Sequence, residues 1–391
     1  MQQEAIFLTP TTPTALPEKS MRLKSLDALR GFDMLWIVSG EGVVHGLASA
    51  TQLPVFMWMS AQLHHSKWNG FSFYDLIFPL FIFIAGVSMP FSFAKKLKGG
   101  EVAAITRQKK QLYGSLSKRC LALILLGMVV NGALTLPGYA STRFVSVLGR
   151  IGLSCFFASL IYLNTKLRTR IIWLFALLLG YWALLGLVPV PGYGAGDLSV
   201  KGNLAAYIDR RWLPGLVLRG DYDPEGLLST IPAIATALLG TFTGSFLRSS
   251  NKKWSDKAKC LMLILAGGIC LGLGLLWNGV LPINKNMWTS SFVLYAGGWS
   301  LLLFGVFYGL IDVMQWKCWS QPFIWLGMNS ILIYMAAHGV VDFKATAMFL
   351  FGGLIHLAPV IWEDALLWSF IVFIQMGLLY FLFKKRIFLK L

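Results

Sequence analysis

Long apolar stretches recur along the whole chain, and most of them are long enough to cross a lipid bilayer. Hydropathy windows of about 19 residues place helices near 31–48, 74–94, 119–136, 145–163, 171–189, 228–247, 260–278, 290–311, 322–338 and 365–384. A spanning helix needs about 20 mostly apolar residues. The pattern therefore predicts an all-α polytopic membrane protein with about ten transmembrane helices. The apolar stretch 346–358 is short, and the pattern leaves open whether it spans or re-enters.

The composition agrees with this fold class and excludes an ordinary soluble domain. Hydrophobic residues make up 56% of the chain and charged residues only 13%, with a mean hydropathy of +0.66. The net charge of +17 does not indicate nucleic-acid binding, because the Lys and Arg residues cluster in short loops between apolar segments. The five cysteines lie in or near apolar helices without metal-ligand spacing, so no metal is expected.

The distribution of basic residues predicts the orientation in the membrane. With a cytoplasmic N-terminus, the inner segments are 1–30, 95–119, 164–170, 248–259, 312–321 and 384–391. These segments hold 25 of the 34 Lys and Arg residues. Because cytoplasmic loops carry the excess of positive charge, we expect both termini inside. We also expect a flexible cytoplasmic segment 1–21, followed by one transmembrane domain over 22–391.

The longest outer loop, roughly 190–227, is rich in Gly and Pro and carries five acidic residues. A connection of this length favours a functional lid or a binding loop, although a tolerated surface insertion is an equal alternative.

Several ionisable residues fall inside or beside the first predicted helix. Arg30 is one helical turn from Asp33, and Glu41 lies two turns further along. Charged groups near the middle of a bilayer cost about 3 kcal/mol on insertion scales, so they normally face a cavity or a partner. A buried ion pair that only fixes helix packing is the alternative for Arg30 and Asp33. Glu41 has no basic partner nearby in sequence.

A second polar group lies on the outer side, immediately before the next apolar stretch. His64 and His65 precede Trp68 and Asn69, and Asp75 opens the following helix. An imidazole beside a carboxylate at a membrane interface is typical of proton transfer, and Asp75 can orient the histidine. The alternatives are an amphipathic histidine at the headgroup level and an Asp75 that merely caps its helix.

Four further polar residues interrupt later apolar stretches. Arg150 sits between glycines near a helix start, Asn329 and Ser330 form a polar notch in 322–338, and His338 ends that helix on the outer side. They are candidates for substrate binding. Interhelical hydrogen bonds, each worth under about 2 kcal/mol, are the alternative for Asn329 and Ser330.

Three sequence blocks carry a resemblance to a known family. The blocks are Arg22–Gly31, His65–Pro79 with its Trp68-Asn69-Gly70 and Asp75–Pro79 motifs, and Gly327–Tyr334. Together they resemble the membrane domain of the heparan-α-glucosaminide N-acetyltransferase family, and most closely its bacterial members. The resemblance covers most of the chain from about Arg22 onward.

The resemblance implies a role for His65 in particular. In that family an outer-face histidine activates a glucosamine amine for attack on acetyl-CoA, and counting back from Trp68-Asn69-Gly70 selects His65 rather than His64. The family also uses an asparagine in its first conserved helix, and the gapless match places Glu41 there, which is a departure. The implied catalytic residues are His65, Glu41 and Asp75. The implied binding residues are Arg30, Asp33, Trp68, Asn69, Arg150, Asn329, Ser330 and His338.

The resulting hypothesis is a multi-pass acyltransferase of the bacterial inner membrane. It moves an acetyl group from cytoplasmic acetyl-CoA, the co-substrate, to an amino sugar or related glycan outside, with His65 as base or acyl carrier. The alternative is a proton-coupled sugar transporter that uses Asp33, Glu41 and His65 as a relay. Expected partners are acetyl-CoA, the sugar acceptor and membrane lipid, with a homodimer left open.

Overall fold

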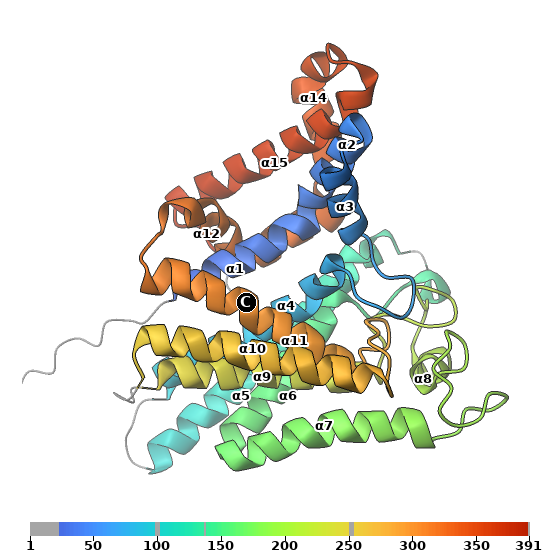
Figure 1. The fold of residues 1–391 in the computed structure, drawn as a ribbon, viewed down its shortest axis with the longest axis vertical. Coiled ribbons are helices and arrows are strands. Elements are labelled where there is room, and N and C mark those ends of the chain that lie inside the picture. Colours follow the sequence, from blue (N-terminus) through green and yellow to red (C-terminus); the bar gives the residue numbers. More distant parts are fainter. Residues whose placement is uncertain (1–22, 98–101, 137, 250–253, 390–391) are drawn as a thin grey trace, which may run out of the picture.

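The computed structural model describes residues 23–97, 102–136, 138–249 and 254–389. Within these ranges the regular elements are helices, apart from two isolated bridges that join Arg143 to Gly215 and Val190 to Gly194. The expected flexible segment 1–21 lies outside the described residues. The prediction of an all-α polytopic membrane protein is confirmed (Figure 1).

The longest connections between successive helices lie within 188–229. In the first half of the chain they are α1 (Lys24–Leu35), η1 (Trp36–Gly40), α2 (Glu41–Thr51), α3 (Pro54–Gln62), α4 (Phe73–Lys96), α5 (Val102–Val130), η2 (Ala133–Thr135), η3 (Tyr139–Ser141), α6 (Val147–Asn164) and α7 (Leu167–Leu187). In the second half they are α8 (Leu204–Trp212), α9 (Thr230–Arg248), α10 (Asp256–Asn278), α11 (Ser290–Tyr308), η4 (Gly309–Val313), η5 (Cys318–Ser320), α12 (Gln321–Met328), α13 (Ser330–Met335), η6 (Ala336–Val340), α14 (Phe343–His356) and α15 (Val360–Lys384).

Eight helices in the described ranges are long and apolar enough to cross a membrane, and nine if one bent pair counts as a span. The bent pair is Cys318–Met328 with Ser330–Val340, and its two parts meet at 66°. The first predicted span corresponds to α1, η1 and α2, which carry more polar residues than a typical span. The stretch 346–358 forms α14, which packs on α15 with Phe351 stacked on Phe370 at 4.3 Å.

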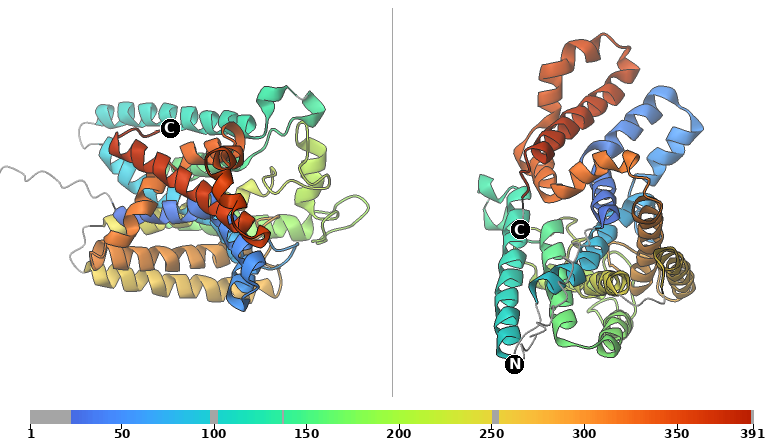
Figure 2. Two further views of the ribbon diagram at one scale, coloured as in Figure 1. Left: turned by 90° about the horizontal axis from the view of Figure 1, so that it is seen from above. Right: turned by 90° about the vertical axis from the view of Figure 1, so that its left-hand side faces the viewer.

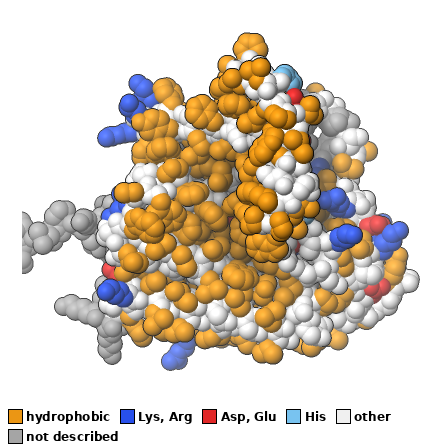
Figure 3. Space-filling view, turned by 45° about the horizontal axis from the view of Figure 1, so that its top comes forward, with side chains coloured by type: hydrophobic (Ala, Val, Ile, Leu, Met, Phe, Trp, Pro, Cys, Tyr) orange, Lys and Arg blue, Asp and Glu red, His pale blue; other side chains and the backbone are white. Residues whose placement is uncertain are grey.

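Helices α7, α9, α10 and α11 run in roughly one direction, and α5 and α15 are inclined to them (Figures 1 and 2). Helix α4 packs on α9, α10 on α11, and α5 on α6, while α1 packs on α12 and α2 on α15. Helix α4 is the centre of the bundle, since 78% of its apolar window is buried, against 17% for α5, α7, α10 and α15. The outer helices therefore present a broad apolar surface, with Lys and Arg near its margins in Figure 3.

Segments that the charge pattern assigns to the cytoplasm meet at one end of the bundle. The backbone N–H groups of Lys24 and Ser25 donate to Asp312 at 3.3 and 3.1 Å. The Tyr113 hydroxyl donates to Asn164 at 2.7 Å. Helix α5 begins at Val102, so much of the predicted basic loop 95–119 is helical. Lys, Arg and Gln are good helix formers, and they continue the apolar helix beyond the expected boundary.

Helices α1 and α12 approach so closely that glycine is required on both sides. A Cβ atom on Gly31 would lie 1.8 Å from the carbonyl oxygen of Phe323, and one on Gly327 would lie 1.9 Å from that of Asp27. Small residues allow such backbone contact between membrane helices. This contact joins the Arg22–Gly31 block to the Gly327–Tyr334 block.

Candidate active site

His65 lies in the turn between α3 and α4, and the start of α4 fixes it. Ser72 is the N-cap of α4, and its backbone N–H donates to Oδ2 of Asp75 at 3.1 Å. The other carboxylate oxygen of Asp75, Oδ1, lies 2.8 Å from Nδ1 of His65. Asp75 therefore caps the helix and orients the imidazole at the same time. Its side chain is 1% exposed, while that of His65 is 46% exposed.

A lysine from a distant loop completes the surroundings of the His65 ring. Nζ of Lys285 lies 3.1 Å from both ring nitrogens and 3.8 Å from Oδ1 of Asp75. The Tyr74 ring is also close, with its centroid 4.7 Å from that of His65. Burial lowers the pKa of Lys285, and the attraction of Asp75 only partly offsets this effect.

The Trp68-Asn69-Gly70 motif holds the loop that carries Lys285. The Asn284 side-chain amide donates to Asn69 at 3.0 Å, and the Gly70 N–H donates to the Ile283 carbonyl at 2.9 Å. Lys285 is 220 residues from His65, so local sequence patterns do not connect the two. The one available signal is its place among the few basic residues that the charge pattern assigns to the outer side.

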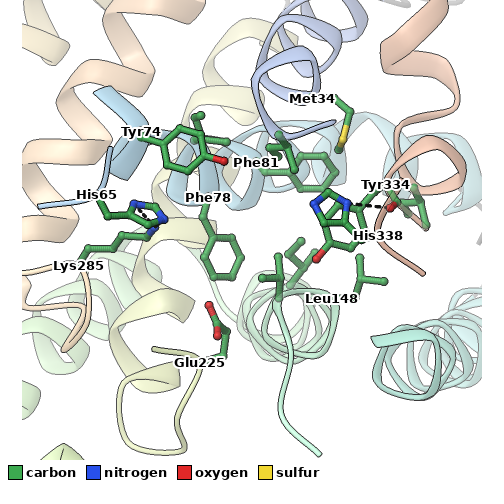
Figure 4. A pocket seen from close by; sticks show the side chains of 15 residues that line it. Met34, His65, Tyr74, Phe78, Phe81, Leu148, Glu225, Lys285, Tyr334 and His338 are labelled. Carbon is green, nitrogen blue, oxygen red and sulfur yellow. Dashed lines mark hydrogen bonds between the residues drawn. The ribbon is translucent and has the colours of Figure 1, made fainter. Parts of the chain in front are cut away.

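His65 and Lys285 line a cavity of about 200 Å³ between α1, α4, α6 and the α13 segment (Figure 4). Its other polar side chains come from Tyr74, Glu225, Tyr334 and His338. The remaining wall is apolar. Such a chamber, with a few convergent polar groups, is typical of a site for a small ligand.

A second cavity, of about 360 Å³, lies toward the end of the bundle predicted to be cytoplasmic. Arg30, Arg119 and Ser330 are among its lining residues. The two cavities share four apolar lining residues, Phe81, Leu148, Ile151 and Ile331. They therefore lie against the same side chains, one toward each end of the bundle.

Comparison with known proteins assigns the chain to a family. Residues 22–272 match the family model described as heparan-alpha-glucosaminide N-acetyltransferase, catalytic. The chain belongs to this family. The heparan-alpha-glucosaminide N-acetyltransferase of Homo sapiens is 30% identical over 386 residues, covering 82% of this chain and 53% of that protein. The Mus musculus protein of the same name is 30% identical over 342 residues, covering 71% and 49%. The chain spans about half the length of these curated relatives.

The family match contains His65 and Asp75, whereas Lys285, Ser330 and His338 follow the matched range. Within the His65–Pro79 block, Trp68 and Asn69 form hydrogen bonds to neighbouring loops and do not line either cavity. The Trp68 indole N–H donates to the Leu198 carbonyl at 2.9 Å, which joins the loop 190–227 to this turn. The His64 ring stacks on His45 instead, with centroids 4.5 Å apart.

The residues of the first family block divide between cavity and packing. The Arg30 guanidinium donates to Ser88 at 3.1 Å and pairs with Asp27 at 3.5 Å, beside the second cavity. Asp33 is 1% exposed, and its carboxylate oxygens have no hydrogen-bond partner among the described residues. Asp33 is not among the lining residues of either cavity, and neither is Glu41, whose carboxylate interacts with the Tyr74 hydroxyl.

Arg150 and Asn329 are not among the lining residues of either cavity. The Arg150 guanidinium is buried, and it donates to the Gly226 carbonyl at 3.1 Å and to the Ser229 hydroxyl. Asn329 sits at the break between α12 and α13. Its amide donates to the Ile387 carbonyl at 3.0 Å and its oxygen accepts from the Leu389 N–H at 3.1 Å, so it anchors the C-terminal segment. Ser330 lines the second cavity and His338 the first.

Glu225 belongs to a cluster of charged side chains with Arg143 and Asp223. Arg143 donates to Asp223 at 2.9 Å and also contacts Glu225. Burial raises the pKa of Asp223, but the hydrogen bonds and charge of Arg143 outweigh this and hold the pKa below its usual value. Asp209, on α8, accepts the N–H groups of Leu227 and Asp223, and its burial raises its pKa to about 6. Through Glu225, the loop 190–227 forms part of the wall of the first cavity.

No group of three or more His, Cys, Asp or Glu side chains in the described part of the chain has the arrangement of a metal site. The groups at the first cavity that can bind a ligand or transfer a proton include the His65–Asp75 pair, Lys285 and Glu225.

Proposed function

We propose that the protein is a membrane acetyltransferase that moves an acetyl group from an acyl-CoA to an amine or hydroxyl of a sugar on the other side of the bilayer. One observation supports this most strongly. A histidine fixed by a buried aspartate lines one cavity, and that cavity adjoins a second one lined by two arginines from the opposite end. Family membership agrees with the proposal, and the relatives are named for N-acetyl transfer.

In this proposal His65 is the base. Asp75 accepts a hydrogen bond from Nδ1–H, which leaves the Nε2 lone pair free to take a proton from the acceptor. The acceptor nitrogen then attacks the thioester carbon, the carbon–sulfur bond breaks, and the departing thiolate takes the proton from His65. Asp75 stabilises the imidazolium that forms in between. Transfer through an acetyl-histidine is the alternative, with Nε2 as the attacking atom.

The donor in this proposal enters from the cytoplasmic side. Arg30 and Arg119 lie at the second cavity, and an adjoining cavity of about 170 Å³ adds Lys96. Basic side chains bind phosphate groups well, so this end suits the nucleotide part of an acyl-CoA. In this proposal the thin pantetheine arm passes the apolar wall that the two cavities share, which includes Phe81 and Ile331. The membrane concerned is a bacterial cytoplasmic membrane in this hypothesis.

Acetyl transfer in detergent tests the proposal. Purified protein is incubated with acetyl-CoA labelled in its acetyl group and with a panel of amino sugars, and the amount of labelled sugar is measured. We expect one or more acetylated sugars from the wild-type protein. The absence of product from folded protein across the panel would count against the proposal.

A sugar transporter is the second candidate, because one helix is broken by 66° at Asn329 and Asp33 is buried without a partner among the described residues. Broken helices and intramembrane acids are common in transporters. A transporter would take up sugar into vesicles without acyl-CoA. An acetyltransferase would consume acyl-CoA in proportion to the sugar modified, so measuring both quantities in one sample separates the two functions.

A further inference from the structure

Lys285 occupies an unusual position against the His65 ring. Its Nζ atom is equally far, 3.1 Å, from Nδ1 and Nε2. An ammonium in the ring plane at equal distance from both nitrogens would collide with the Cε1 carbon that lies between them. The Lys285 ammonium must therefore lie over the face of the ring. It approaches from one side of His65, while Tyr74 lies on the other side in Figure 4.

This position of the Lys285 ammonium affects the neutral and the protonated form of His65 differently. A cation over the face of a neutral aromatic ring is attracted to it. The same cation over an imidazolium is repelled, because two like charges then lie in contact distance. The Nε2 lone pair, which lies in the ring plane, stays open to a substrate. We propose that Lys285 is a positioning residue that keeps His65 neutral and its Nε2 free, and this inference rests on the proposed role of His65 as base.

Burial and hydrogen bonds of its loop fix the position of Lys285 beside His65. Its side chain is only 13% exposed, and its loop is hydrogen-bonded to the turn of His65 through Asn284 and Gly70. Asp75 lies 3.8 Å from Nζ and offsets part of the cost of burying the ammonium. Burial still lowers the pKa of Lys285, so its charge is lost earlier on the alkaline side than that of an ordinary lysine.

The other ionisable side chains that line the first cavity do not supply this effect, and Lys67, two residues from His65 in the chain, is exposed and lies outside the lining. Asp75 binds Nδ1 and attracts a proton to the ring, which opposes Lys285. Glu225 lines the same cavity and also favours a charged ring, although it is paired with Arg143. Tyr74, Tyr334 and His338 complete the titratable lining. Glu41 interacts with Tyr74 rather than with His65. Lys285 is thus the cation in this lining that opposes protonation of His65.

The protonation state of His65 can be read without any activity. The chain has five histidines, so a spectrum of protein with ¹⁵N-labelled histidine is simple, and His65→Gln assigns the His65 signals. In the wild-type protein near neutral pH we expect a neutral ring with hydrogen on Nδ1 and none on Nε2. An imidazolium under these conditions would overturn the inference, whether or not the protein transfers acetyl groups.

Two substitutions then test the charge itself. In Lys285→Met the His65 ring should gain its second proton at a pH about one unit higher than in the wild type, because a like charge is removed. The acid limb of the pH–rate profile for acetyl transfer should also move to higher pH. Lys285→Arg keeps the charge and should stay near the wild type. Lys201→Met, at an exposed lysine of the outer loop, is the matched control.

An unchanged titration in Lys285→Met, or an arginine variant that behaves like methionine, would overturn the inference. A lack of acetyl transfer by the wild type would refute the proposed function and leave the titration result to decide on Lys285.

Discussion

His64 and His65 are neighbours in the chain, yet their rings lie in different surroundings. His65 is bound to Asp75 and lines the first cavity, whereas His64 stacks on His45. Loss of a general base typically lowers a rate by about 100- to 10,000-fold. We expect His65→Ala to reduce kcat for acetyl transfer by this factor and to leave acyl-CoA binding largely intact. His64→Ala is the control and should cost much less. Equal losses in the two variants would refute the assignment of His65.

Asp75 has two tasks, and they can be separated by substitution. Asp75→Asn should keep part of the helix cap, because its amide oxygen can still accept the N–H of Ser72, but it removes the carboxylate that holds Nδ1–H of His65. We expect a loss in kcat of about 100-fold or more with a modest change in melting temperature. Ser72→Ala weakens the cap and leaves the His65–Asp75 bond in place, so it should lower the melting temperature more than the rate. The opposite ranking would show that Asp75 acts mainly as a cap.

The sequence predicts those parts of the site that are close together in the chain. His65 and Asp75 are ten residues apart, and a turn followed by a helix start brings such residues into contact. Lys285 and Glu225 come from loops whose positions depend on the packing of α9, α10 and α11 around α4. No local pattern encodes that packing. Trp68 and Asn69 belong to the same motif as His65, and the structure shows them bracing loops instead of lining the cavities.

At the scale of helices, periodicity predicts shared faces where a helix is regular and fails where it is not. Asp33, Ile37 and Glu41 step by four residues, which predicts one shared face. The structure has a π-helical turn at Trp36–Gly40, and this turn widens the spacing. Ile37 lines the first cavity, while Asp33 and Glu41 are not among its lining residues. The polar notch at Asn329 is visible in the sequence, but the 66° bend and the contacts of Asn329 with the C-terminal segment are not.

The contact of α1 with α12 supports both cavities, and glycine makes it possible. Gly31→Ala would place a methyl group 1.8 Å from the Phe323 carbonyl oxygen, so the helices must separate. Overpacking of this kind costs about 1–3 kcal/mol or more. We expect a lower melting temperature and weaker acyl-CoA binding, because Arg30 adjoins Gly31. Gly268→Ala, in α10, is the control, since nothing lies within 4 Å of the position that its methyl group would take. A Gly31→Ala protein as stable as this control would contradict the close packing.

For the whole molecule, charge pattern and hydropathy indicate the class of fold and the grouping of segments at each end. They do not encode the long-range contacts that decide which loops meet. The predicted orientation has its own test. Lys67 is exposed beside His65, and Cys318 is exposed near the opposite end. In intact cells an impermeant thiol reagent should label Lys67→Cys and should not label the native Cys318. The reverse pattern would place His65 in the cytoplasm.

Transfer across a sealed bilayer tests the central claim most directly. The protein is reconstituted into vesicles, and vesicles that hold it in one orientation are selected. Acetyl-CoA labelled in the acetyl group is added only on the Arg30 side, and an amino sugar only on the His65 side. We predict labelled acetyl-sugar on the His65 side, matched by free CoA on the Arg30 side, and none with His65→Ala. Sugar uptake without consumption of acyl-CoA, or acetylation only when both substrates share one side, would contradict this account.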